Sequence, residues 1–141
     1  MSDNEVKPLN FVPELNIGYT VTRRPDGGMH FSFTDALPGT LAHWRKFSLE
    51  HLYESDRLTR NLYDLSQLDS IPEEAIQVAV EVNNDPSARN IRLAVVARSA
   101  AVRVSLRRIA DLTTSGGVEM ALFSTVEEAE AWLDRPLTLV R

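Results

Sequence analysis

Two serines that each follow an aspartate closely are the residues most suggestive of chemistry in this chain. Ser66 and Ser70 lie in the stretch NLYDLSQLDSIPEEA (61–75), and Ser70 comes directly after Asp69. An exposed serine can be phosphorylated, whereas a serine at the start of a helix caps free backbone N–H groups. Ser70 stands three residues before Glu73, which is the spacing of a capping box. The surrounding acids would repel a phosphate of charge near −2, so the residues favour a helix cap over a phosphorylation site.

No recognisable catalytic or metal-binding motif accompanies these serines. The sequence contains neither a phosphate-binding glycine loop nor a G-x-S-x-G motif. The three histidines, His30, His43 and His51, form no zinc-binding pattern. The absence of cysteine excludes disulfides, thiolate chemistry and cysteine-based metal sites. We therefore predict a protein without enzymatic activity that uses no metal and no cofactor.

A basic segment follows in an otherwise acidic chain. Arg103 and Arg107 are one turn apart on a predicted helix near residues 100–112. One interpretation is a docking patch for an acidic partner or an anionic ligand. The other is a solvated helix face whose arginines pair with acids of neighbouring helices. Six arginines fall within twenty residues: Arg89, Arg92, Arg98, Arg103, Arg107 and Arg108.

The bulk composition limits the class of protein. A chain of 141 residues with 43% hydrophobic residues can form one domain with a single core. Its net charge of −5 argues against general binding to nucleic acid or to anionic membranes. The N-terminal residues do not resemble a signal peptide, and no apolar run reaches the roughly 18 residues that span a bilayer. We expect a cytoplasmic protein.

The elements that would position these side chains begin with a hairpin. Residues 1–15 have no periodicity, and we expect them to form a loose arm before a single domain over 16–141. Apolar and polar residues alternate on both sides of Asp26-Gly27, which predicts an antiparallel hairpin over 17–33.

Helices and strands alternate after the hairpin. The segment 70–84 is ambiguous because its apolar residues also alternate as in a strand, but its start and stop signals favour a helix. This order implies an α/β fold with a mostly parallel central sheet, an N-terminal antiparallel hairpin and helices packed on the sheet. The predicted elements are a helix at about 40–54, a strand in RNLYDL (60–65), a helix over 70–84, strands at 91–97 and 118–123, a helix near 100–112, a helix that opens with a Ser124–Glu127 capping box and ends before Pro136, and a tail or edge strand over 137–141.

Three segments of the chain resemble a known family. LYDLSQLDS, IRLAVVARSAAVRVSLRRIADL and VEMALFSTVEEAEAWL are similar to the SpoIIAA-like proteins, relatives of the STAS domain, over about residues 60–134. The resemblance implies a regulatory or protein-interaction domain whose partner is another protein or a second copy of the chain, as a homodimer. In antagonist-type STAS proteins a partner kinase phosphorylates a serine that follows an aspartate. The resemblance carries this position onto Ser70, with Asp69 beside it and Ser66 in the preceding D-L-S element.

The contact surface implied by this resemblance is the start of the 70–84 helix together with Arg103 and Arg107. A different hypothesis is a carrier of a small molecule or a lipid, because SpoIIAA-like folds are similar to lipid-binding domains. Trp44, Phe47 and Leu52 of the first helix could then line a pocket. The alternative is that these three side chains belong to the core.

Overall fold

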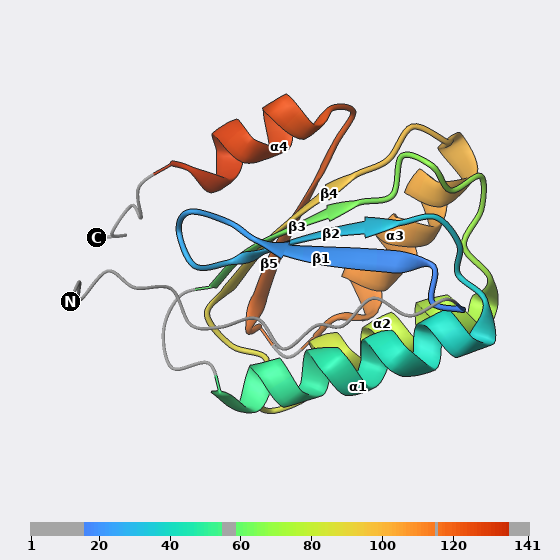
Figure 1. Ribbon diagram of the computed structural model, residues 1–141, viewed down its shortest axis with the longest axis horizontal. Coiled ribbons are helices and arrows are strands. Elements are labelled where there is room, and N and C mark those ends of the chain that lie inside the picture. The colour runs from blue at the N-terminus through green and yellow to red at the C-terminus, as the bar shows by residue number, and fades with distance from the viewer. Residues whose placement is uncertain (1–15, 55–58, 115, 136–141) are drawn as a thin grey trace.

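A computed structural model describes residues 16–54, 59–114 and 116–135 of the chain. Figure 1 shows these residues as one sheet with helices on both faces. The predicted arm over 1–15 and the predicted tail over 137–141 lie outside the described residues. The elements in chain order are β1 (Tyr19–Arg23), β2 (Met29–Phe33), α1 (Pro38–Glu54), β3 (Thr59–Asp64), α2 (Glu73–Asn83), β4 (Ile91–Val96), α3 (Ala100–Leu112), β5 (Val118–Phe123) and α4 (Val126–Leu133).

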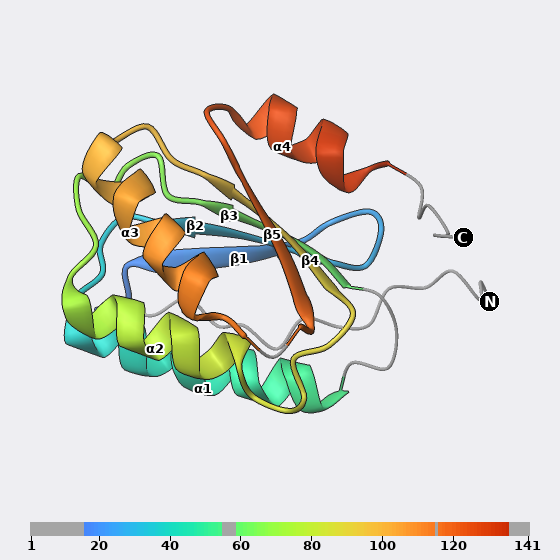
Figure 2. The ribbon, with the colours of Figure 1, turned by 180° about the vertical axis from the view of Figure 1, so that it is seen from behind.

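The five strands form a mixed sheet in the order β1-β2-β3-β4-β5. β1 and β2 pair antiparallel, and β2 to β5 are all parallel. Each parallel strand lies beside the strand that precedes it in the chain, so the helix between them crosses one face of the sheet. Figures 1 and 2 show α1, α2 and α3 on this face and α4 on the other. The predicted α/β class with an antiparallel hairpin at one edge is confirmed.

The hairpin turn depends on local chemistry. Arg24 N donates to Gly28 O at 2.8 Å, and Gly27 N donates to Arg24 O at 3.0 Å. Gly27 has a φ of 91°, which glycine adopts without a steric penalty because it lacks a Cβ. The Asp-Gly pair therefore performs the role that the sequence predicts for it.

The sheet separates two hydrophobic cores. The larger core lies between the sheet and α1, α2 and α3, and the smaller one lies under α4. β4 contributes to both, because Leu93 and Val95 belong to the larger core while Ala94 and Val96 belong to the smaller one. This explains its continuous apolar sequence, which is typical of a strand that is buried on both faces.

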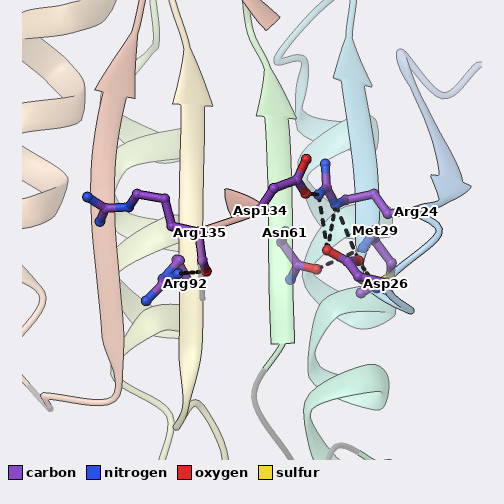
Figure 3. Close-up of polar contacts among 8 residues, drawn as sticks. Arg24, Asp26, Met29, Asn61, Arg92, Asp134 and Arg135 are labelled. Atoms are coloured by element: carbon purple, nitrogen blue, oxygen red, sulfur yellow. Dashed lines mark hydrogen bonds and ion pairs between the residues drawn. The ribbon is translucent and has the colours of Figure 1, made fainter. Parts of the chain in front are cut away.

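Buried arginines attach the end of α4 to the sheet. Arg24, which is only 6% exposed, donates from Nη2 to Asp26 at 3.0 Å and to Asp134 at 3.1 Å. Arg92 donates to the carbonyl oxygen of Arg135 at 3.1 Å. Figure 3 shows these contacts from the hairpin turn and β4 to the residues that follow α4. Because each of these guanidinium groups has acceptors within the fold, we assign this cluster a structural role.

The helix α2 begins later than the sequence predicts. Its N-cap is Pro72, with a φ of −68° and no side-chain cap, and the helix starts at Glu73. The predicted capping box between Ser70 and Glu73 is therefore wrong. The physical reason is Pro72 itself, since a proline disfavours helical backbone angles at the residue before it, Ile71. A helix could not readily continue from Ser70 through Ile71.

The side-chain cap of α4 lies one residue later than the sequence predicts. Thr125 is the N-cap, and its side chain accepts a hydrogen bond from Glu128 N at 3.1 Å. Glu128 in turn accepts from Ser124 N at 3.3 Å. The predicted pair, Ser124 and Glu127, is therefore wrong by one position. Only the hydroxyl half of the predicted capping box is present, because Glu128 accepts from the residue before the N-cap and not from the N-cap itself. Among the described residues, no helix combines the length and the apolar character needed to cross a membrane.

Candidate functional site

A partly open cavity of about 140 Å³ lies between the sheet and the helices α1, α2 and α3. Its walls consist mostly of aliphatic and aromatic side chains from all three helices and from β2, β3 and β4. No lysine, arginine, aspartate or glutamate of the described residues lines it. A cavity of this kind is suited to neutral apolar matter, because a charge placed there would lose its hydration without gaining a partner.

Small side chains on α2 leave this space open. Ala75 and Ala79 are one helical turn apart and both line the cavity. Opposite them, β2 and β3 contribute the large rings of Phe31 and Tyr63, which stack with their centroids 4.2 Å apart. The rings hold each other in place, so they cannot easily move to fill the volume that the alanines leave.

Two hydroxyl groups are the distinctive polar feature of the cavity. Tyr63 Oη accepts a hydrogen bond from Trp44 Nε1 at 2.9 Å. Ser48, one turn after Trp44 on α1, is only 7% exposed, and its Oγ forms no hydrogen bond of acceptable geometry with any described residue. Burial raises the pKa of Tyr63, and the nearby Trp44 and Ser48 groups lower it by less. Tyr63 therefore keeps its proton at physiological pH and can act as a donor.

Three further polar side chains that line the cavity have partners in the fold. His51 Nδ1 is hydrogen-bonded to the carbonyl oxygen of Phe47 at 2.8 Å. Asn61 Oδ1 accepts from Met29 N at 3.0 Å, and Asn83 Nδ2 donates to a threonine hydroxyl at 3.3 Å. Ser48 thus differs from these three residues, because its Oγ makes no hydrogen bond of acceptable geometry within the described chain.

The structure places only some of the pocket residues predicted from the sequence at the cavity. Trp44 lines the cavity. Phe47 is buried in the larger core, where its ring makes an edge contact with Phe31, and it does not line the cavity. The side chain of Leu52 lies outside the described residues. Sequence reasoning missed Ser48, although a serine four residues after Trp44 on the apolar side of an amphipathic helix was a usable signal.

The serines that motivate the phosphorylation hypothesis lie at the carboxyl edge of the sheet. Asp69 and Ser70 are both exposed. Ser99 Oγ at the start of α3 donates to the Asp69 carbonyl oxygen at 2.8 Å and so fixes this loop. Ser66 is half-buried, and its N–H donates to Asp64 Oδ1 at 3.0 Å in a turn that ends β3.

The two arginines of the predicted basic face differ in their surroundings. Arg103 is half-buried, donating to the Ala97 carbonyl oxygen at 3.1 Å and to Ser124 Oγ at 2.7 Å. Arg107 is exposed. Only Arg107 of this pair therefore presents an open guanidinium surface, while Arg103 ties the start of α3 to the end of β5.

Neither the sequence nor the fold leads to a known relative. No protein-family model, curated protein or solved structure matches this chain. The resemblance to SpoIIAA-like proteins over residues 60–134 thus stays a prediction. Within the described ranges, no three potential metal-binding side chains gather in one place. The case for a function depends on the chemistry of the cavity and of the loop around Ser70.

Proposed function

We propose that this protein is a non-enzymatic binding domain that holds a small apolar molecule between the sheet and α1, α2 and α3. The cavity of about 140 Å³ is the observation that carries the proposal. Apolar space of this size inside a core lowers stability by up to roughly 3 kcal/mol, at about 24 cal/mol per Å³. A ligand that fills the space would offset much of this cost and would stabilise the folded chain.

The arrangement of the polar groups supports binding rather than catalysis. Ser48 and His51 both line the cavity, but Ser48 Oγ has no hydrogen bond to His51 or to any other described base. An activated serine nucleophile needs such a base within hydrogen-bonding distance. The lining therefore offers a ligand contact surface and hydrogen-bonding groups, without the pair of groups that acyl transfer would require.

Filling the cavity is expected to abolish binding while leaving the protein folded. Ala79→Leu adds three carbon atoms to the space between α2 and the sheet. In excess ethylbenzene, the wild-type protein should show a higher Tm and chemical-shift changes at the lining residues, and the variant should show neither. Thermal unfolding and NMR titration measure the two effects. Native mass spectrometry of protein from its native host would report a retained ligand directly.

The matched control for this variant is Ala110→Leu. Ala110 lies on the exposed side of α3, so the same substitution there leaves the cavity unchanged. This variant should bind ethylbenzene like the wild-type protein. A wild-type Tm that does not respond to any neutral apolar probe would contradict the proposed binding function.

A second function is favoured by the exposure of Ser70. As the resemblance to SpoIIAA-like proteins suggests, the loop over 65–72 would dock either another protein or a second copy of the chain. Phosphorylation of Ser70 would control this contact. In support, Ser70 is exposed and has no capping role. Glu73, one of the acids that would repel a phosphate, is paired with Arg108 at 2.7 Å, and hydrogen bonds from Arg108 lower its pKa.

This second proposal predicts a selective modification. Incubation with ATP and fractionated kinases of the native host should place phosphate on Ser70 and not on Ser66, because Ser66 is half-buried in the turn after β3. Mass-spectrometric mapping measures the site. Ser70→Ala should lose the phosphate and Ser66→Ala should keep it. An unmodified Ser70 across all kinase fractions would rule out the switch.

A further inference from the structure

We infer that the ligand is a neutral molecule with one ring or a hydrocarbon body of similar size, carrying one oxygen acceptor that binds the hydroxyl groups of Ser48 and Tyr63. This inference rests on the proposed binding function and narrows it to a chemical class. It predicts that phospholipids, sterols and ionised fatty acids bind in the cavity more weakly than such a molecule.

The volume of the cavity limits the size of the ligand. Apolar cavities of roughly 150 Å³ in proteins admit one benzene ring. At about 140 Å³, this cavity is of the same size. The side chains around it are held in place by packing, as the stacked rings of Phe31 and Tyr63 illustrate. The part of a long acyl chain or a fused-ring system that exceeds this volume would therefore have to displace parts of the core or stay outside the cavity.

The lining excludes charged ligands. It contains no lysine, arginine, aspartate or glutamate among the described residues, and its one histidine, His51, already uses Nδ1 in a hydrogen bond to the carbonyl oxygen of Phe47. The lining therefore offers no permanent counter-ion to a carboxylate or an ammonium group. A buried charge without a counter-ion is strongly unfavourable. A ligand that ionises in water would have to become neutral to enter, which lowers its apparent affinity at neutral pH.

The two hydroxyl groups define the polar anchor. Ser48 Oγ is buried and, although it lies close enough to Tyr63 to interact with that hydroxyl, it makes no hydrogen bond of acceptable geometry among the described residues, a condition that is uncommon in folded proteins. Tyr63 Oη already accepts a hydrogen bond from Trp44 Nε1, so its own hydrogen remains to be donated. One ligand oxygen with two lone pairs, such as that of a ketone or an aldehyde, can accept from both hydroxyl groups. Such a ligand would satisfy Ser48 and place its ring among the apolar side chains.

Three probes of similar size test the inference on the wild-type protein. Acetophenone has a ring and a carbonyl oxygen, ethylbenzene lacks the oxygen, and benzoate carries a charge. Acetophenone should bind about tenfold more tightly than ethylbenzene, the difference expected for a well-formed hydrogen bond in a buried site. Benzoate at neutral pH should bind more weakly than both. NMR titrations give the three dissociation constants.

Ser48→Ala should remove most of the preference for acetophenone while leaving the affinity for ethylbenzene unchanged. The substitution removes an unpaired hydroxyl, so the folded state should persist, as circular dichroism would verify. Ser32→Ala, on a half-buried residue that alternates with Phe31 and Phe33 along β2, should keep the full preference.

The outcomes separate this inference from the proposed function. Equal affinities of the wild-type protein for acetophenone and ethylbenzene would overturn the inference and leave the binding function in place. If benzoate bound more tightly than acetophenone, the inference would likewise be overturned and the binding function would stand. Failure of both neutral probes to bind would overturn the binding function itself. A full preference retained in Ser48→Ala would also contradict the proposed anchor.

Discussion

Phe31→Ala is expected to lower the free energy of unfolding by about 3–5 kcal/mol, the usual range for a large aromatic side chain removed from a core. Phe31 is 0% exposed and lies at the centre of the larger core. Its ring stacks on Tyr63 at 4.2 Å and on Tyr19 at 6.2 Å, and it makes an edge contact with Phe47 at 6.0 Å. Truncation removes these contacts and enlarges the cavity that Phe31 lines. Denaturant unfolding measures the loss.

Phe123→Ala is the matched control for this effect. Phe123 is half-buried on the other face of the sheet, where its ring contacts Trp132 at 5.6 Å. Because less of this side chain is removed from water, its truncation should cost distinctly less. Equal losses for the two variants would show that Phe31 does not hold the central position that its packing indicates.

Gly28→Ala is expected to destabilise the protein by about 3 kcal/mol or more, at or above the upper end of typical overpacking effects. A Cβ at this position would lie 1.7 Å from the carbonyl oxygen of Arg60 and 2.7 Å from its carbonyl carbon. Both are backbone atoms of β3, so no side-chain rotation can relieve the clash. The start of β2 would have to move away from β3 and would disturb the hydrogen bond from Met29 N to Asn61. Denaturant unfolding again measures the change.

Gly39→Ala provides the same chemical change without the clash. Gly39 lies near the start of α1, and a Cβ there would meet no atom within 4 Å. Alanine also favours helix formation over glycine, so this variant should be neutral or more stable by up to about 1 kcal/mol. A loss of stability similar to that of Gly28→Ala would contradict the steric explanation.

The regular elements were predictable because their causes are local. The hairpin depends on Asp26-Gly27, and Gly27 adopts the positive φ that the turn requires. The segment that became α2 was ambiguous, since its apolar residues alternate as in a strand. In the structure Ala75, Ile76 and Val82 are buried on one side of a helix while Val78 is half-buried, so the helical period prevails.

The errors at helix starts also have local causes. Both capping boxes were predicted from spacing alone. Pro72 restricts the residue before it, so α2 cannot begin at Ser70. At α4 two hydroxyl residues are adjacent, and Thr125 rather than Ser124 has the extended backbone of an N-cap. The first error could have been avoided from the sequence, because Pro72 is visible there. Choosing between Ser124 and Thr125 required the backbone angles of the folded chain.

The sequence by itself determined the α/β class, the alternation of strands and helices and the apolar character of the core, because periodicity and turn chemistry act over a few residues. Only the tertiary structure decided which side chains meet. Ser48 on α1 and Tyr63 on β3 line one cavity because their two elements pack together. Its volume is the space left between Ala75 and Ala79 on one side and stacked rings on the other. Such a space depends on how surfaces fit across layers, and no local pattern encodes that fit.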